Sequence, residues 1–145
     1  MAVGDFSGDG KADILWRDTS GNLAMWLMNG PSVLLNSYVG NVPTSWTPVG
    51  VADFNGDGKA DIFWRNTSGD LAMWLMNGPS VLFGNYLGNV PTAWTPVQFG
   101  DFNHDGKNDI LWRDTSGNLA MWFMNGVSKL SGTTVGNVPT AWSPQ

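Results

Sequence analysis

The sequence predicts an all-β protein, and three observations support this fold class. Gly and Pro are abundant, at 19 and 8 of 145 residues, whereas charged residues make up only 13% of the chain. This composition suits short strands joined by tight turns better than it suits helices. Apolar residues make up 42% of the chain and include nine Trp, which is enough for a core. Finally, one pattern of residues recurs along the whole chain, as in folds built from stacked units.

The repeat has a period of 48 residues, and no insertion breaks it. Equivalent positions are occupied by Asp5, Asp53 and Asp101, by Trp16, Trp64 and Trp112, by Trp26, Trp74 and Trp122, and by Trp46, Trp94 and Trp142. Units of this size cannot bury their faces alone and must pack on their neighbours. We therefore treat residues 1–145 as one segment of three repeats, approximately 1–48, 49–96 and 97–145.

The residue pattern of each repeat predicts four strands, which we describe for the second repeat. The first is a run of small residues that suits a crowded inner strand, and the second contains bulky β-forming residues before a turn. The third has two apolar faces, as expected of a strand between two neighbouring sheets. Its Leu, Ala and Met also favour a helix, but six residues between turns are too few. The four predicted strands are 46–52, 62–65, 71–76, and 81–83 with 86–87.

Four strands per 48 residues is the size of one blade of a β-propeller. The predicted architecture is therefore a β-propeller segment with three four-stranded antiparallel blades per chain. Propellers have typically four to eight blades, so three blades leave two apolar faces uncovered.

We expect homo-oligomerisation to close the ring. The C-terminal residues 142–145 match the start of the first strand and residues 1–4 match its end, so one copy can continue the strand of another. Such a head-to-tail contact is heterologous and must close. A homodimer gives six blades and is preferred over a homotrimer, which gives nine. Near-identical repeats of this kind are typical of an engineered or recently amplified sequence.

The segment between the first and second strands of each repeat carries oxygen-bearing side chains at alternate positions. Nine of the twelve acidic residues, all of them Asp, lie in these three loops. An empty loop of this kind concentrates like charges, which a hard divalent cation would neutralise. Calcium accepts six to eight oxygen ligands, and the position-seven carbonyl would join the side chains at positions one, three, five and nine. The candidate metal ligands are Asp5, Ser7, Asp9, Lys11 and Asp13; Asp53, Asn55, Asp57, Lys59 and Asp61; and Asp101, Asn103, Asp105, Lys107 and Asp109.

Calcium fits these loops better than other metals, and we expect about one ion per repeat. Magnesium gives up its waters reluctantly, and soft metals lack Cys or His ligands here. The lysine at position seven would contribute only its carbonyl, with its side chain pointing away. Gly58 at position six allows the sharp turn around an ion. The alternative is a metal-free turn rich in Asp, Asn and Gly.

The loop differs from an EF-hand, because position twelve is Trp instead of Glu and a strand follows it. Residues 53–62, Asp-Phe-Asn-Gly-Asp-Gly-Lys-Ala-Asp-Ile, resemble the FG-GAP/VCBS repeat that also occurs in integrin α-subunit propellers. The resemblance spans the whole chain. It implies a β-propeller with calcium loops between the first two strands of each blade, in a secreted or cell-surface protein. Ser7 departs from the usual Asp or Asn, and His104 replaces a glycine, where we expect a solvated side chain.

Three classes of function remain after these observations. The first is a calcium-stabilised structural scaffold without catalysis. The second is a lectin-like propeller that binds carbohydrate through Trp46, Trp94 and Trp142, although core packing explains each Trp as well. An enzyme is the poorest interpretation, because one His, no Cys and no Glu leave only Asp for acid–base chemistry.

The charge of the chain argues against two kinds of partner, and its hydropathy shows neither a membrane span nor a signal peptide. The net charge of −5 and the absence of a Lys/Arg cluster argue against nucleic acid and against anionic membrane surfaces. Nowhere do 18 apolar residues follow one another, and the N-terminus lacks the pattern of a signal peptide.

Overall fold

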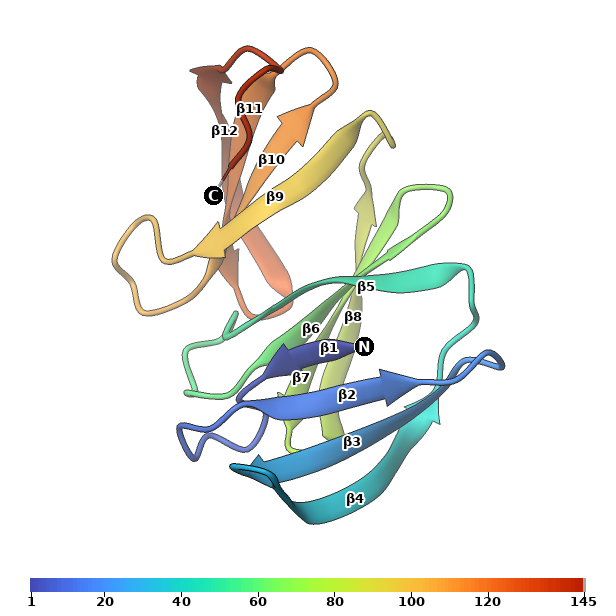
Figure 1. Ribbon diagram of the computed structural model, residues 1–145. Helices are drawn as coiled ribbons and strands as arrows, with labels where there is room; N and C mark the ends of the chain where they lie inside the picture. The colour runs from blue at the N-terminus through green and yellow to red at the C-terminus, as the bar shows by residue number, and fades with distance from the viewer. Residues whose placement is uncertain (145) are drawn as a thin grey trace.

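The computed structural model describes residues 1–144, so Gln145 of the third predicted repeat lies outside the described residues. These residues form three sheets, which we call blade 1 (β1–β4), blade 2 (β5–β8) and blade 3 (β9–β12). In each blade the strands follow one another in chain order, and every pairing is antiparallel (Figure 1). The strands are β1 (Ala2–Gly4), β2 (Asp13–Arg17), β3 (Asn22–Asn29), β4 (Ser32–Asn41), β5 (Trp46–Ala52), β6 (Asp61–Asn66), β7 (Asp70–Asn77), β8 (Ser80–Asn89), β9 (Trp94–Gly100), β10 (Asp109–Asp114), β11 (Asn118–Asn125) and β12 (Ser128–Asn137).

This architecture confirms the all-β fold class and the three four-stranded antiparallel blades. Residues 1–144 contain no helix, and therefore none that is long and apolar enough to cross a membrane. The predicted first strand, 46–52, coincides with β5. The fourth predicted strand was broken at residues 84–85, whereas β8 is continuous there. Gly84 lies close to the Trp74 ring, since a Cβ at that position would be 2.9 Å from it.

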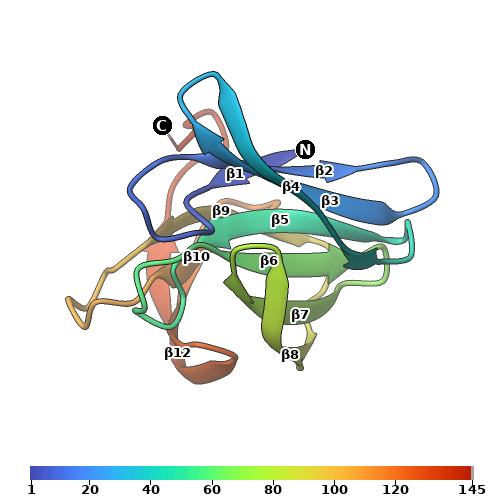
Figure 2. The same ribbon diagram turned by 90° about the horizontal axis from the view of Figure 1, so that it is seen from below.

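The blades pack face to face, with the second between the first and third (Figure 1). Their inner strands β1, β5 and β9 lie side by side (Figure 2). Small residues are required on these strands, as predicted. A Cβ at Gly4 would lie 2.5 Å from Val51, and one at Gly50 would lie 2.3 Å from the Phe99 ring.

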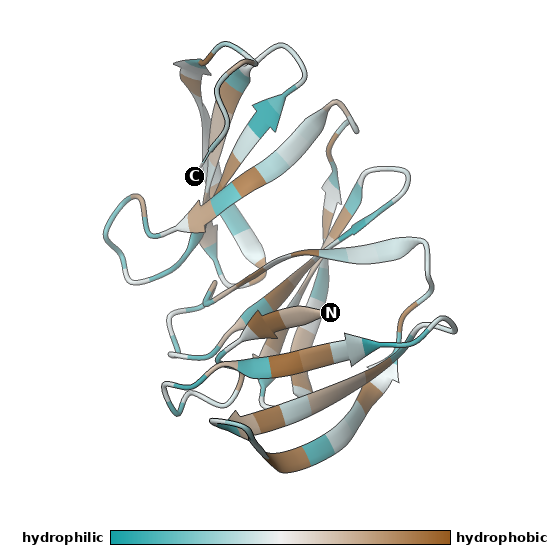
Figure 3. Ribbon diagram, viewed as in Figure 1, coloured by the Kyte–Doolittle hydropathy of each residue, from teal (hydrophilic) through white to brown (hydrophobic). Residues whose placement is uncertain are grey.

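The hydrophobic core is divided into two equivalent clusters, one at each junction between blades. At the first junction, Leu15, Leu23 and Met25 of blade 1 pack against Ile62 and Trp64 of blade 2. The second junction repeats this arrangement with Phe63, Leu71 and Met73 of blade 2 and with Ile110 and Trp112 of blade 3. The apolar segments lie within the strands, whereas the loops at their ends are mostly pale or hydrophilic (Figure 3). Burial of apolar area between sheets is therefore the main stabilising contribution to the arrangement.

Candidate functional site

The predicted metal loop joins the first and second strands of each blade and folds over its first carboxylate. In blade 2, Asp53 accepts hydrogen bonds from the backbone nitrogens of Gly56 at 2.7 Å, Asp57 at 3.2 Å and Gly58 at 2.8 Å. Gly58 has a φ of 82°, a left-handed conformation that glycine adopts without a steric penalty. The Asp5 and Asp101 carboxylates accept equivalent hydrogen bonds in their own loops.

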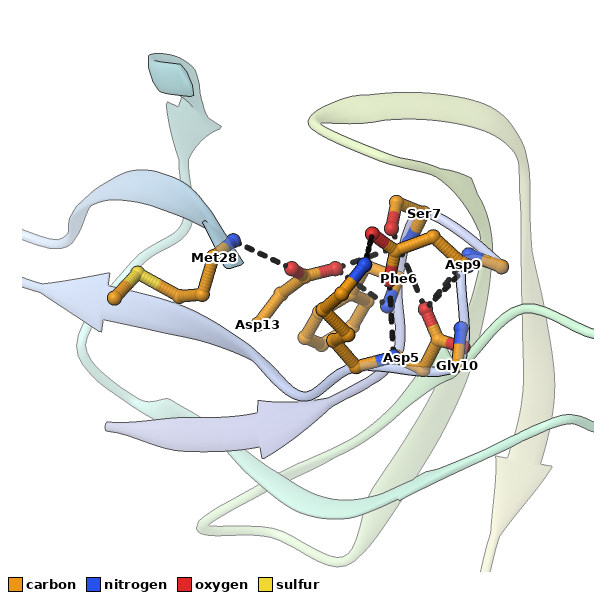
Figure 4. Close-up of polar contacts among 9 residues, drawn as sticks. Asp5, Phe6, Ser7, Asp9, Gly10, Asp13 and Met28 are labelled. Atoms are coloured by element: carbon orange, nitrogen blue, oxygen red, sulfur yellow. Dashed lines mark hydrogen bonds and ion pairs between the residues drawn. The ribbon is translucent and has the colours of Figure 1, made fainter. Parts of the chain in front are cut away.

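The aspartate at position nine connects the loop to the third strand. Asp61 is fully buried, and its two oxygens accept hydrogen bonds from the backbone nitrogens of Phe54 at 2.9 Å and Met76 at 3.0 Å. In blade 1, Asp13 lies in the same way between Phe6 and Met28 (Figure 4). Asp109 makes the equivalent contacts in blade 3.

Burial has a marked effect on the acidity of Asp61. It raises the pKa of this carboxyl to about 6, although the two backbone hydrogen bonds lower it, and the carboxylates of Asp57 and Asp53 raise it further. The charged form of Asp61 is therefore costly in this environment, and a nearby cation would favour it.

The middle of each loop is exposed. The carboxylate of Asp57 accepts a hydrogen bond from the Lys59 backbone nitrogen at 2.9 Å, and the Asn55 side chain contacts it at 3.2 Å. In blade 1, the Lys11 ammonium lies 2.9 Å from the Asp9 carboxylate. Our expectation that the lysine side chain points away is therefore wrong for Lys11, because an uncompensated carboxylate attracts it. This hydrogen bond is the main reason why the pKa of Asp9 is lowered.

The structure places the candidate ligands of each repeat in one short loop but does not bring their carboxylates to a common point. Within residues 1–144, no three Asp or His side chains are close enough together to hold a metal ion. The donors nevertheless suit calcium, because all of them are oxygens on a chain segment that already turns tightly. The two oxygens of Asp61 accept one hydrogen bond each, so both keep lone pairs for a cation.

His104 differs from its equivalents Gly8 and Gly56 in backbone strain. Its side chain is exposed, as we predicted, and its φ is 63°. Non-glycine residues adopt this region at an energetic cost. The third loop therefore carries a strain that the first two loops avoid.

The loops also join neighbouring blades through their backbones. The Asp5 carbonyl accepts a hydrogen bond from the Ala60 nitrogen of the next loop at 2.7 Å, and the Phe6 carbonyl accepts one from Gly78 at 2.8 Å. At the second junction, the Asp53 carbonyl accepts from Asn108 at 2.8 Å and the Phe54 carbonyl accepts from Gly126 at 2.7 Å. Sequence reasoning missed this role, because backbone contacts between repeats leave no residue pattern.

Three arginines that the sequence analysis did not single out as functional fix the segments before the first strands. Arg17 donates to the carbonyl oxygens of Val42 at 2.6 Å, Pro43 at 2.7 Å and Trp46. Its guanidinium also lies over the Trp64 ring of the next blade, 5.9 Å from the centroid. Arg65 and Arg113 donate to equivalent carbonyls, and burial lowers the pKa of Arg65. The signal was available in the sequence, because each arginine directly follows Trp16, Trp64 or Trp112.

The candidate ligand-binding tryptophans have different environments. Trp46 lines a cavity of about 250 Å³ between blades 1 and 2, together with Trp64 and Trp74. Trp94 packs against the second core cluster, whereas Trp142 is 70% exposed. Trp64 is buried, and its Nε1–H has no acceptor within residues 1–144. Trp46 and Trp94 thus contribute to packing, and Trp46 also lines a cavity.

A comparison with protein families gives a match that agrees with this geometry. The model of the FG-GAP-like repeat matches residues 5–64 and 53–112, which together cover more than half of the chain. Each matched segment begins at position one of a loop and ends within the second strand of the next blade. A search of curated proteins finds no match.

Proposed function

The chain belongs to the FG-GAP-like repeat family, and from that premise we propose that it is a calcium-stabilised structural β-propeller scaffold. The role is mechanical: loops that bind calcium hold consecutive blades together, and further copies of the chain complete the ring. The family resemblance also supports a secreted or cell-surface location for such a scaffold.

The double role of the loops is the observation that supports this proposal most. Each loop contains three carboxylates, and its backbone also donates or accepts the hydrogen bonds that join two blades. Repulsion between the carboxylates acts against the loop conformation that these bonds need. Calcium would be held by the fifteen candidate ligands, and when bound it would neutralise the loops. Three ions would change the formal net charge of the chain from −5 to about +1.

A catalytic role has no support from the arrangement of the acidic groups. The loop aspartates accept hydrogen bonds from their own backbone, and His104 is exposed on a loop. Asp18 and Asp114 accept hydrogen bonds from the backbone nitrogens of turn residues, as Asn66 does in blade 2. We therefore assign these groups to structure.

Calcium titration of chelator-treated protein tests the proposal. Calorimetry should detect about three sites per chain, and the melting temperature should rise with calcium concentration, since a ligand at about 100 times its Kd stabilises by about 2.7 kcal/mol per site. Magnesium at the same concentration is the control and should have a much smaller effect. An unchanged melting temperature in calcium and in EDTA, for protein that was shown to contain metal before chelation, would contradict the structural role.

Carbohydrate binding is a second candidate function. The cavity beside Trp46 is lined by three Trp rings, and sugars offer apolar faces that stack on such rings. A glycan array on the calcium-loaded protein tests this function. Binding that is lost in Trp74→Ala but kept in Leu82→Ala would support this function, because Leu82 is exposed on β8. An array without hits would leave the scaffold role as the remaining candidate.

A further inference from the structure

The two outer faces of the three-blade stack are more exposed than the same faces inside it. The head face of blade 1 consists of Val3, Ile14, Trp16 and Met28, and the tail face of blade 3 consists of Phe102, Leu111, Leu119 and Met121. Trp16 is 38% exposed, whereas its equivalents Trp64 and Trp112 are 1% exposed. Phe102 is 45% exposed, whereas its equivalents Phe6 and Phe54 are 0% exposed.

Polar groups on the two faces are complementary as well. Inside the chain, the carbonyls at loop positions one and two accept hydrogen bonds from the next blade. The equivalent acceptors on the tail face are the carbonyls of Asp101 and Phe102, and the equivalent donors on the head face are the nitrogens of Ala12 and Gly30. Within residues 1–144, no further blade lies next to either set. The tail face thus offers the acceptors, and the head face offers the matching donors.

Arg113 gives an additional, directional contact. Arg17 and Arg65 each lie over a Trp of the next blade, at 5.9 and 5.8 Å from the ring centroids. Arg113 donates to the equivalent carbonyls of its own repeat, those of Val138 and Pro139. In a docked pair, Arg113 would therefore lie over Trp16, the exposed ring on the head face of the second copy.

We propose that the tail face of one chain docks on the head face of a second copy and reproduces the junction that already occurs twice within the chain. Phe102 is buried by this contact, the Arg113 guanidinium covers Trp16 of the second copy, and its Ala12 and Gly30 nitrogens donate to the Asp101 and Phe102 carbonyls. The occupant is a second copy because the faces match the internal junctions residue by residue. This inference rests on the proposed scaffold role and names the surfaces that serve it.

The same contact brings together residues equivalent to those that line a cavity inside the chain. Inside the chain, the 250 Å³ cavity combines Val42 and Pro43, which follow blade 1, with Trp46, Trp64 and Trp74 of blade 2. The equivalent residues at the proposed junction are Val138, Pro139 and Trp142 of one copy and Trp16 and Trp26 of the other. Assembly therefore covers Trp142, which is 70% exposed in the single chain.

Mixing two variants tests the proposal. Light scattering of the 145-residue chain in calcium should give a multiple of 15.7 kDa, with twice this mass for a six-bladed ring. Trp16→Asp blocks the head face and Phe102→Asp blocks the tail face, so each variant alone should be a monomer. An equimolar mixture should recover a species of twice the monomer mass, because one intact head and one intact tail remain. Leu82→Asp, on the outer strand, is the control and should assemble like the original chain.

Milder substitutions make the result independent of whether the Asp variants fold. Trp16→Ala and Phe102→Ala remove half-exposed rings, so they leave no cavity in a lone chain. Each should raise the concentration at which the assembly dissociates by about 10- to 100-fold.

Four results would overturn the proposal: a monomeric original chain in calcium, full assembly of both Asp variants, loss of assembly in Leu82→Asp, or unchanged dissociation of both Ala variants. A monomer that calcium stabilises would refute the docking contact but not the calcium role. An oligomer that is indifferent to EDTA rejects the calcium role alone.

Discussion

The buried aspartate at loop position nine should stabilise the protein without metal as well as with it. Asp61→Ala leaves the backbone nitrogens of Phe54 and Met76 buried without acceptors. Each such group costs about 1–3 kcal/mol, or about 2–6 kcal/mol for the pair. The raised pKa of about 6 means that the charged carboxylate of Asp61 is costly to bury at neutral pH. Removing this charge regains on the order of 1–2 kcal/mol after allowance for solvent screening, and this gain offsets part of the loss. From the mid-points of these two ranges, about 4 and about 1.5 kcal/mol, we expect a net loss of about 2–3 kcal/mol in the free energy of unfolding at pH 7.

Chemical denaturation in EDTA and in calcium separates this role from metal binding. Asp57→Ala is the matched control, because Asp57 lies in the same loop but is exposed, and within residues 1–144 Lys59 is its only backbone donor. In EDTA, Asp57→Ala should change the unfolding free energy by less than about 0.5 kcal/mol, since exposed polar positions contribute little. In calcium, both variants should lose part of the metal-dependent gain. An Asp61→Ala variant within about 0.5 kcal/mol of the original chain in EDTA would refute the reasoning.

Three other changes test the loop, the inner strand and a turn. His104→Gly should stabilise the protein by about 1 kcal/mol by removing a residue with φ of 63°, measured by thermal unfolding; a lower melting temperature would contradict this. Gly50→Ala should destabilise the protein by about 1–3 kcal/mol, because the new Cβ would lie 2.3 Å from the Phe99 ring. If the midpoint of chemical denaturation does not change, the inner strands are not crowded. Hydrogen bonds, first that from Asn89, lower the pKa of Asp70, so its stabilising contribution is complete above its ordinary value of 3.8 and is lost as the pH falls through the lowered pKa. Asp70→Asn should therefore show a shallower loss of melting temperature below about pH 4 than the original chain, and an equal loss would contradict the assignment.

Local patterns in the sequence were sufficient to predict the blades. The apolar residues on both faces of 71–76 predicted a strand between two sheets. The structure buries Leu71 and Met73 in the second core cluster and Met76 in the first. The small residues of 46–52 identified the inner strand. Such features depend on residues that are adjacent in the chain, so a single repeat already displays them. The nine-residue loop was also located correctly, since its alternating oxygens and its glycines lie within one turn.

The tertiary structure alone decided what the loop side chains and carbonyls contact. Asp61 binds the nitrogen of Met76, fifteen residues away, and the Asp5 carbonyl binds the nitrogen of Ala60 in the next blade. Neither contact can be derived from composition or spacing, because a backbone nitrogen is the same in every residue and only packing selects which one is near. For the same reason, the sequence shows an arginine after Trp16, Trp64 and Trp112, but it does not show which three carbonyls each arginine holds.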